Sequence, residues 1–86
     1  MAAYKLIIHK SAQKFLGGIP VKVADKIVLK IYALKNEPRP AGVKKLAGSL
    51  NLYRIRIADY RVVYSIYDNI LTIEVIRIGN RKDVYR

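Results

Sequence analysis

The chain has 86 residues, which is enough for one domain with a modest core and too few for two. Its hydrophobic fraction of 52% excludes a disordered tail, and no apolar run reaches the roughly 18 residues of a membrane span, so we expect a soluble protein. Seventeen basic residues against six acidic ones give a formal net charge of +11, which favours a polyanionic partner. Nucleic acid is the leading candidate, followed by a membrane surface or an acidic protein.

The composition also excludes several kinds of site. The chain has no cysteine, so it has no disulfides, thiolate metal sites or cysteine nucleophile. The first residues lack the long apolar segment and cleavage site of a signal peptide, which favours a cytoplasmic location. One histidine, His9, and six scattered acidic residues offer no metal-ligand spacing, so we expect no metal and no other cofactor.

The N-terminal half is predicted to form one strand and two helices. Residues 3–8 are rich in β-forming residues, and Ser11 offers an N-cap oxygen for a short helix that a pair of glycines ends. Pro20 suits the first turn of a second helix, where its missing N–H costs nothing. The apolar residues of this helix recur at three- and four-residue spacing: Val21, Ala24, Ile27, Val28, Ile31 and Leu34. Three lysines are expected to form its solvated side: Lys22, Lys26 and Lys30.

The C-terminal half is predicted to form a three-stranded meander. A loop over residues 39–48 precedes strands at residues 53–57, 60–67 and 71–78. Asp68-Asn69 suits a tight hairpin turn, and Gly79-Asn80 breaks the last strand. Short connections imply antiparallel neighbours. The predicted fold is therefore a single α+β domain of order β-α-α-β-β-β, with two N-terminal helices packed on one face of an antiparallel-dominated sheet.

Arginines gather on the predicted strands and after them. Side chains alternate along an extended strand, so Arg54 and Arg56 share one face, and Arg61 follows across the turn. The guanidinium is a planar set of donors that matches phosphate geometry and stays charged. We therefore predict a phosphate-binding face on these strands. Three tyrosines that alternate with apolar residues are expected in the core: Tyr53, Tyr60 and Tyr64.

Four short motifs occur in a fixed order along the chain. They are Lys45-Leu46-Ala47-Gly48, Tyr53-Arg54-Ile55-Arg56, Asp59-Tyr60-Arg61-Val62-Val63-Tyr64 and Ile78-Gly79-Asn80-Arg81-Lys82-Asp83-Val84-Tyr85-Arg86. With this element order, the set resembles the RelE/ParE superfamily of small bacterial and archaeal toxins, and more specifically its RelE branch. The resemblance spans essentially the whole chain.

The resemblance implies a ribosome-dependent endoribonuclease that cleaves messenger RNA in the ribosomal A site. It also implies a cognate antitoxin that wraps the toxin and inhibits it, and operator DNA bound only through the antitoxin complex. By position, the family's active site corresponds to Arg54, Arg56, Arg61, Arg81 and Tyr85. Four further basic residues are predicted to bind RNA: Lys44, Lys45, Lys82 and Arg86. Many relatives have histidine where this chain has Asn80.

The expected chemistry is metal-free attack of a 2′-hydroxyl on the adjacent phosphate. Several arginines can stabilise the charge of the transition state. Their pKa, above about 12, makes them poor bases, so we expect electrostatics and substrate orientation to carry most of the catalysis. Tyr85 is expected to donate to the leaving oxygen or to stack on a base, and the ribosome to supply the missing orientation.

Two other functions remain open on the sequence. A ParE-like toxin would share the fold but poison DNA gyrase, and the arginine set argues against it. A non-catalytic module would bind an acidic antitoxin and, with it, operator DNA; Asn80 in place of histidine keeps this reading open. In each case the antitoxin is expected to lay an amphipathic helix over the apolar helical surface of the toxin.

Overall fold

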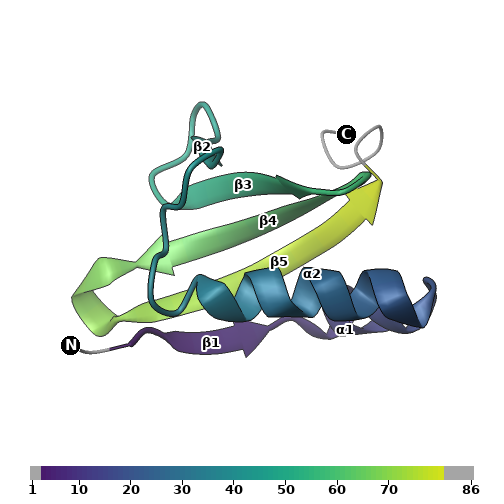
Figure 1. Cartoon of the computed structure of the whole chain (residues 1–86). Coiled ribbons are helices and arrows are strands. Elements are labelled where there is room, and N and C mark those ends of the chain that lie inside the picture. Colours follow the sequence, from purple (N-terminus) through teal and green to yellow (C-terminus); the bar gives the residue numbers. More distant parts are fainter. Residues whose placement is uncertain (1–2, 81–86) are drawn as a thin grey trace.

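The computed structural model describes residues 3–80 and shows two helices packed with a five-stranded sheet (Figure 1). The elements in chain order are β1 (Lys5–Ile8), α1 (Lys10–Gly17), α2 (Val21–Ala33), β2 (Lys44–Lys45), β3 (Leu52–Ile57), β4 (Tyr60–Tyr67), a 3-10 turn (Asp68–Ile70) and β5 (Thr72–Asn80). The strand order is β1-β5-β4-β3-β2, with β1 parallel to β5 and the other neighbours antiparallel. The predicted α+β class and the meander of β3, β4 and β5 are confirmed.

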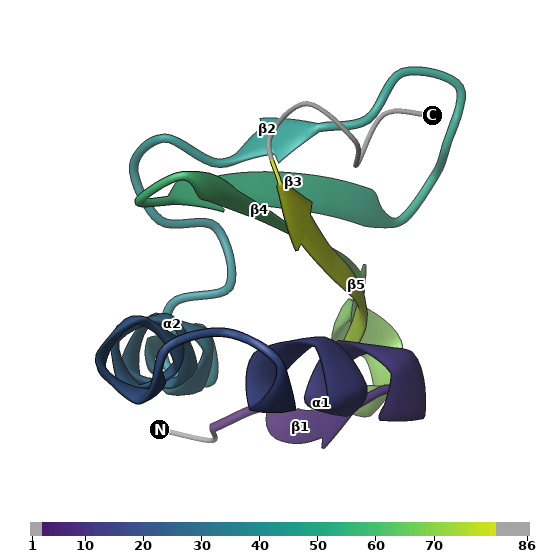
Figure 2. The ribbon, with the colours of Figure 1, turned by 90° about the vertical axis from the view of Figure 1, so that its right-hand side faces the viewer.

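The hydrophobic core lies between the helices and one face of the sheet. In Figure 2 the sheet curves from β2 at the top to β1 at the bottom, and both helices lie in the lower half. Ile27 and Ile31 of α2 are fully buried because residues four apart lie on one side of a helix. Alternate residues of β4 meet them: Val62, Tyr64 and Ile66. Tyr64 is fully buried and Tyr53 and Tyr60 pack partly buried against this core, so the prediction for the three tyrosines is confirmed.

Contacts with β5 decide where α1 begins. The helix starts at Lys10 with His9 at the N-cap, so the prediction that Ser11 caps it is wrong. The backbone N–H of His9 donates to the Val75 carbonyl of β5 (2.8 Å), and Ser11 Oγ donates to the Ile76 carbonyl (3.3 Å). These long-range bonds outweigh the local preference for serine at an N-cap.

The second helix, α2, begins directly after Pro20, which lies at its N-cap. Val21, one of the apolar residues predicted for the buried side of this helix, is 73% exposed. It is the first residue of α2, and the fully buried residues of the helix begin only at Ile27. Lys22, Lys26 and Lys30 are exposed, as predicted for the solvated side. No helix within residues 3–80 is long and apolar enough to cross a membrane.

Three predicted boundaries in the C-terminal half are wrong. Lys44 and Lys45, expected in a loop, form the short edge strand β2 because they pair with β3. Asp68-Asn69 does not make a two-residue hairpin; a 3-10 turn ends at Leu71, whose φ of 47° is left-handed. Gly79-Asn80 does not break β5, since Asn80 still pairs with Tyr60.

Candidate functional site

The hairpin of β3 and β4 brings the predicted arginines together. Arg56 lies directly opposite Arg61, and Arg54 lies opposite Val63 in the next row of the pairing. Opposite residues of an antiparallel pair share a face of the sheet, so all three arginines lie on the face away from the helices. Like charges placed directly opposite each other destabilise a hairpin. An anion bound between the two guanidinium groups would offset this repulsion.

The three arginines differ in how much water reaches them. Arg54 and Arg61 are half-buried, and the Nε atom of Arg61 is shielded from solvent, whereas Arg56 is exposed. Arg56 Nε donates to the carbonyl of Ala58 in the turn (3.3 Å), where a φ of 55° is unusual for a residue with a Cβ. Because charges interact more strongly where water is partly excluded, Arg54 and Arg61 are the better placed to hold a phosphate.

The two lysines of β2 are divided between the faces of the sheet. Lys44 lies opposite Arg54 and so joins the arginine face, whereas Lys45 lies opposite Tyr53 on the other side. Both lysines are exposed. The structure therefore groups Lys44, and not Lys45, with the predicted phosphate-binding residues.

A fourth arginine, Arg77 of β5, lies on the same face and is absent from the sequence prediction. The pairing of β4 with β5 shifts between Val63, which faces Arg77, and Tyr64, which faces Val75. This shift leaves Ile76 unpaired as a β-bulge, which moves Arg77 from the core face to the arginine face. The signal in the sequence is the slip in the apolar spacing of β5 from two residues to three: Ile73, Val75 and Ile78.

Four predicted site residues lie outside the described residues: Arg81, Lys82, Tyr85 and Arg86. The last described residue, Asn80, pairs with Tyr60 at the turn end of the β3–β4 hairpin. It is exposed.

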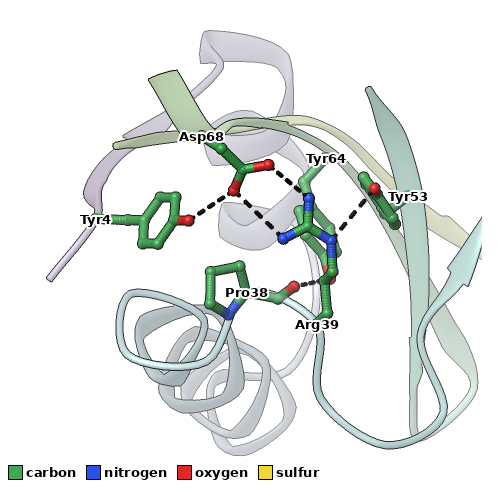
Figure 3. Close-up of polar contacts among 6 residues, drawn as sticks. All are labelled: Tyr4, Pro38, Arg39, Tyr53, Tyr64 and Asp68. Carbon is green, nitrogen blue, oxygen red and sulfur yellow. Dashed lines mark hydrogen bonds and ion pairs between the residues drawn. The ribbon is translucent and has the colours of Figure 1, made fainter. Parts of the chain in front are cut away.

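Arg39 is the centre of a separate polar cluster, shown in Figure 3. Its guanidinium donates two hydrogen bonds to Asp68, from Nη2 to Oδ2 (2.8 Å) and from Nη1 to Oδ1 (3.3 Å), and one from Nε to the hydroxyl of Tyr53 (3.3 Å). The hydroxyl of Tyr4 donates to the same carboxylate (2.6 Å). The cluster joins the segments before β1, after α2 and after β4. Arg39 is therefore committed to holding the fold rather than to the arginine face.

Asp68, Tyr4 and Tyr64, which lie in or beside the cluster, each have a shifted pKa. The hydrogen bond from Arg39, followed by the one from Tyr4, lowers the pKa of Asp68. The hydrogen bond to Asp68 raises the pKa of Tyr4. Burial raises the pKa of Tyr64, whose hydroxyl donates to the Pro38 carbonyl (2.8 Å) at the edge of the cluster. Near neutral pH, these shifts favour the charged form of Asp68 and the neutral forms of Tyr4 and Tyr64.

Replacing Asp68 with asparagine should lower the stability of the protein relative to the wild type near neutral pH. This loss should become smaller at low pH. The lowered pKa of Asp68 means that its contribution is complete above the unfolded value, about 3.9, and is lost as pH falls through the folded value. The melting temperatures of wild type and Asp68→Asn should therefore converge on acidification. The effect should be modest because the Arg39 and Asp68 side chains are 43% and 55% exposed.

The control for removing one negative charge is Asp25→Asn, on the exposed side of α2. The ion pair would be contradicted as the source of the effect if the difference in melting temperature between wild type and Asp68→Asn stayed constant, or grew, as the pH fell from 7 to below the unfolded pKa of the carboxyl.

A groove runs between α2 and β3 on the side of the molecule that carries the helices. It consists of one pocket of about 290 Å³ and a neighbouring one of about 220 Å³, which share Lys30, Ala41 and Ile55 as lining residues. The larger pocket adds Lys26 to the lining, and the smaller one adds Glu37. Apolar side chains with Lys26 and Lys30 beside them suit a ligand that is apolar on one side and carries acidic groups near these lysines.

Comparison with known proteins identifies the family. Residues 6–85 match the family described as ParE toxin of type II toxin-antitoxin system, parDE. The chain is 31% identical to the putative toxin RelE1 of Methanocaldococcus jannaschii, over 96% of each chain. It is 36% identical to the toxin RelE of Mycobacterium tuberculosis, over 96% of this chain and 87% of that one.

Solved structures agree with the sequence relatives. The archaeal RelE–RelB complex from Pyrococcus horikoshii contains a chain that matches with a TM-score of 0.84 and 31% identity, over 95% of this chain and 99% of that one. The intact RelBE toxin–antitoxin complex of E. coli matches with a TM-score of 0.77 and 28% identity, over 91% and 96%. The chain therefore belongs to the RelE/ParE family and is a RelE-like toxin of a type II toxin–antitoxin system.

Proposed function

We propose that this toxin is a ribosome-dependent endoribonuclease that cleaves messenger RNA in the ribosomal A site. The observation that carries the proposal is the grouping of Arg54, Arg56 and Arg61 on one face of the β3–β4 hairpin. Lys44 extends that face on the neighbouring strand. The net charge of +11 favours contact with a large polyanion such as the ribosome. Relatives named RelE support the same assignment.

The reaction is attack of the 2′-oxygen on the adjacent phosphorus. The bond from phosphorus to the 5′-oxygen breaks, which leaves a 2′,3′-cyclic phosphate and a 5′-hydroxyl. The 2′-hydroxyl loses its proton and the 5′-oxygen gains one. Arg54 and Arg61, with Arg81 from the C-terminal motif, neutralise the charge that develops on the pentacoordinate phosphate.

Proton transfer is the weaker part of this site. Arginine is protonated at any physiological pH and cannot act as a base. We assign to Tyr85 the donation of a proton to the leaving 5′-oxygen, on the correspondence of the C-terminal motif. Electrostatic stabilisation without an efficient base gives a slow reaction on free RNA, so the ribosome supplies the in-line geometry of the substrate. No metal or other cofactor is part of this mechanism.

We further propose a cognate antitoxin as the protein partner, with operator DNA bound through that complex. Relatives of this chain have been crystallised as RelE–RelB complexes. The groove between α2 and β3, which has Ile55 among its apolar lining residues and Lys26 and Lys30 along its α2 side, suits an amphipathic helix with acidic residues on one flank. Because ribosomes and messenger RNA are its targets, we place the toxin in the cytoplasm.

The proposal is tested by primer extension on ribosomes translating a defined message with the purified toxin added. New 3′ ends at A-site codons should appear, should be absent on the same message without ribosomes, and should disappear when the antitoxin is added. The match to the ParE family motivates a second candidate, inhibition of DNA gyrase. A supercoiling assay with purified gyrase separates the two: inhibition there, with no ribosomal cleavage, would overturn the ribonuclease assignment.

A further inference from the structure

The sheet pairing arranges the basic residues of the arginine face in two rows that cross the strands. The first row runs Lys44, Arg54, Val63, Arg77 from β2 to β5. The second row runs Arg56, Arg61, Gly79 from β3 to β5. Arg77 therefore stands in the same row as Arg54, on the opposite side of Val63 from it.

The strand pairing places Arg54 and Arg77 on opposite sides of β4. Neighbouring strands lie about 4.8 Å apart, so the backbones of Arg54 and Arg77 are about 10 Å apart across Val63. Arg56 and Arg61 lie on adjacent strands and can hold a single phosphate between them. Arg77 is a diagonal neighbour of Arg61 on the side of β4 away from Arg54 and Arg56, so it is placed to reach the next phosphate of an RNA strand.

The charges on this face favour a polyanion over a single anion. Four arginines lie within roughly a Debye length of one another, about 10 Å at 0.1 M salt, so they repel one another in the free protein. Glu74, which the pairing with Ser65 places on the same face, has its Oε2 3.2 Å from Nε2 of His9. Binding of several successive phosphates would relieve the repulsion.

We propose that Arg77 binds the phosphate of a nucleotide next to the cleaved one and so positions single-stranded RNA across β5. This inference rests on the proposed ribonuclease function and extends its site by one nucleotide. The bulge at Ile76 is the structural device that creates the contact, because an unbroken alternation would direct Arg77 into the core. Arg77 is thus a positioning residue, distinct from the arginines that contact the reacting phosphate.

The test is the salt dependence of RNA binding. The dissociation constant of a single-stranded 2′-O-methyl RNA of about ten nucleotides, which cannot be cleaved because its 2′-oxygens are blocked, is measured over a range of KCl concentrations. Each phosphate contact to a single strand contributes about 0.7 to the slope of log K against log salt. Arg77→Gln should lower the slope by about that amount, and Arg77→Lys should largely retain it because it keeps the charge.

The matched control is Lys22→Gln, which removes one positive charge from the exposed side of α2. An equal slope for Arg77→Gln and Lys22→Gln would overturn the proposal. On ribosomes, Arg77→Gln should raise KM with kcat nearly unchanged, whereas a loss confined to kcat would contradict a positioning role. If the wild type cuts no message on ribosomes, the proposed function fails, while the salt slope still decides whether Arg77 contacts RNA.

Discussion

Replacing Arg61 with methionine should lower the rate of A-site cleavage by about 10²–10³-fold, the usual loss when one preorganised donor to a developing oxyanion is removed. Arg61 is half-buried, with Nε shielded, and it lies directly opposite Arg56. Methionine keeps the apolar stem that packs against the sheet and removes only the guanidinium, so the fold should be preserved. The measurement is single-turnover cleavage on programmed ribosomes, with thermal melting of each variant as the check on folding.

The neighbouring positions supply controls for this experiment. Arg56→Met should cost less than Arg61→Met, because Arg56 is exposed and its charge is screened by water. Lys22→Gln, at the start of α2, should leave cleavage unchanged. If Arg61→Met cuts at the wild-type rate, the β3–β4 hairpin is not the phosphate site. If all three variants lose activity equally, net charge rather than geometry drives the toxin.

The grouping of Arg54, Arg56 and Arg61 could be predicted because it depends only on local rules. A strict two-residue alternation and a short turn fix the register of a hairpin, and register fixes which side chains share a face. The pairing of Arg56 with Arg61 follows directly from a two-residue turn. Their chemical roles remain predictions, as do those of Arg81 and Tyr85.

Arg77 was not predicted as a site residue because one unpaired residue in a strand moves every following side chain to the opposite face of the sheet. With strict alternation, Arg77 falls in phase with Ile73 and Val75 and therefore in the core. The bulge at Ile76 corrects this, and it forms because β4 and β5 can bury Val62 and Ile78 against each other only after such a shift.

The polar cluster around Arg39 could not be predicted for a different reason. Its partners, Tyr4 and Asp68, are separated by 64 residues and meet only because β1 pairs with β5. The same parallel pairing places β5 beside α1 and moves the N-cap of the helix from the predicted Ser11 to His9. Local sequence preferences carry no information about contacts of this range.

Ile31→Ala should lower the free energy of unfolding by about 2–5 kcal/mol, the cost of removing a large buried aliphatic side chain and leaving a cavity. Ile31 of α2 is fully buried in the core beneath the sheet. Since small domains have a total stability of about 5–15 kcal/mol, this single change removes a substantial share of it. Leu29→Ala, on the same helix but 70% exposed, is the matched control and should change stability by less than about 0.5 kcal/mol. Urea denaturation followed by circular dichroism measures both.

The contrast between Ile31→Ala and Arg61→Met separates folding from chemistry in this toxin. Ile31 is a fully buried member of the core, on the other side of the sheet from the arginine face, so Ile31→Ala should reduce the amount of folded toxin while the cleavage rate of each folded molecule stays at the wild-type value. Arg61→Met should do the reverse, with a normal urea midpoint and a low rate. Equal urea midpoints for Ile31→Ala and Leu29→Ala would show that α2 does not support the sheet through Ile31. A lower rate per folded molecule in Ile31→Ala would mean that packing of α2 sets the geometry of the arginine face, because the two layers share one continuous core.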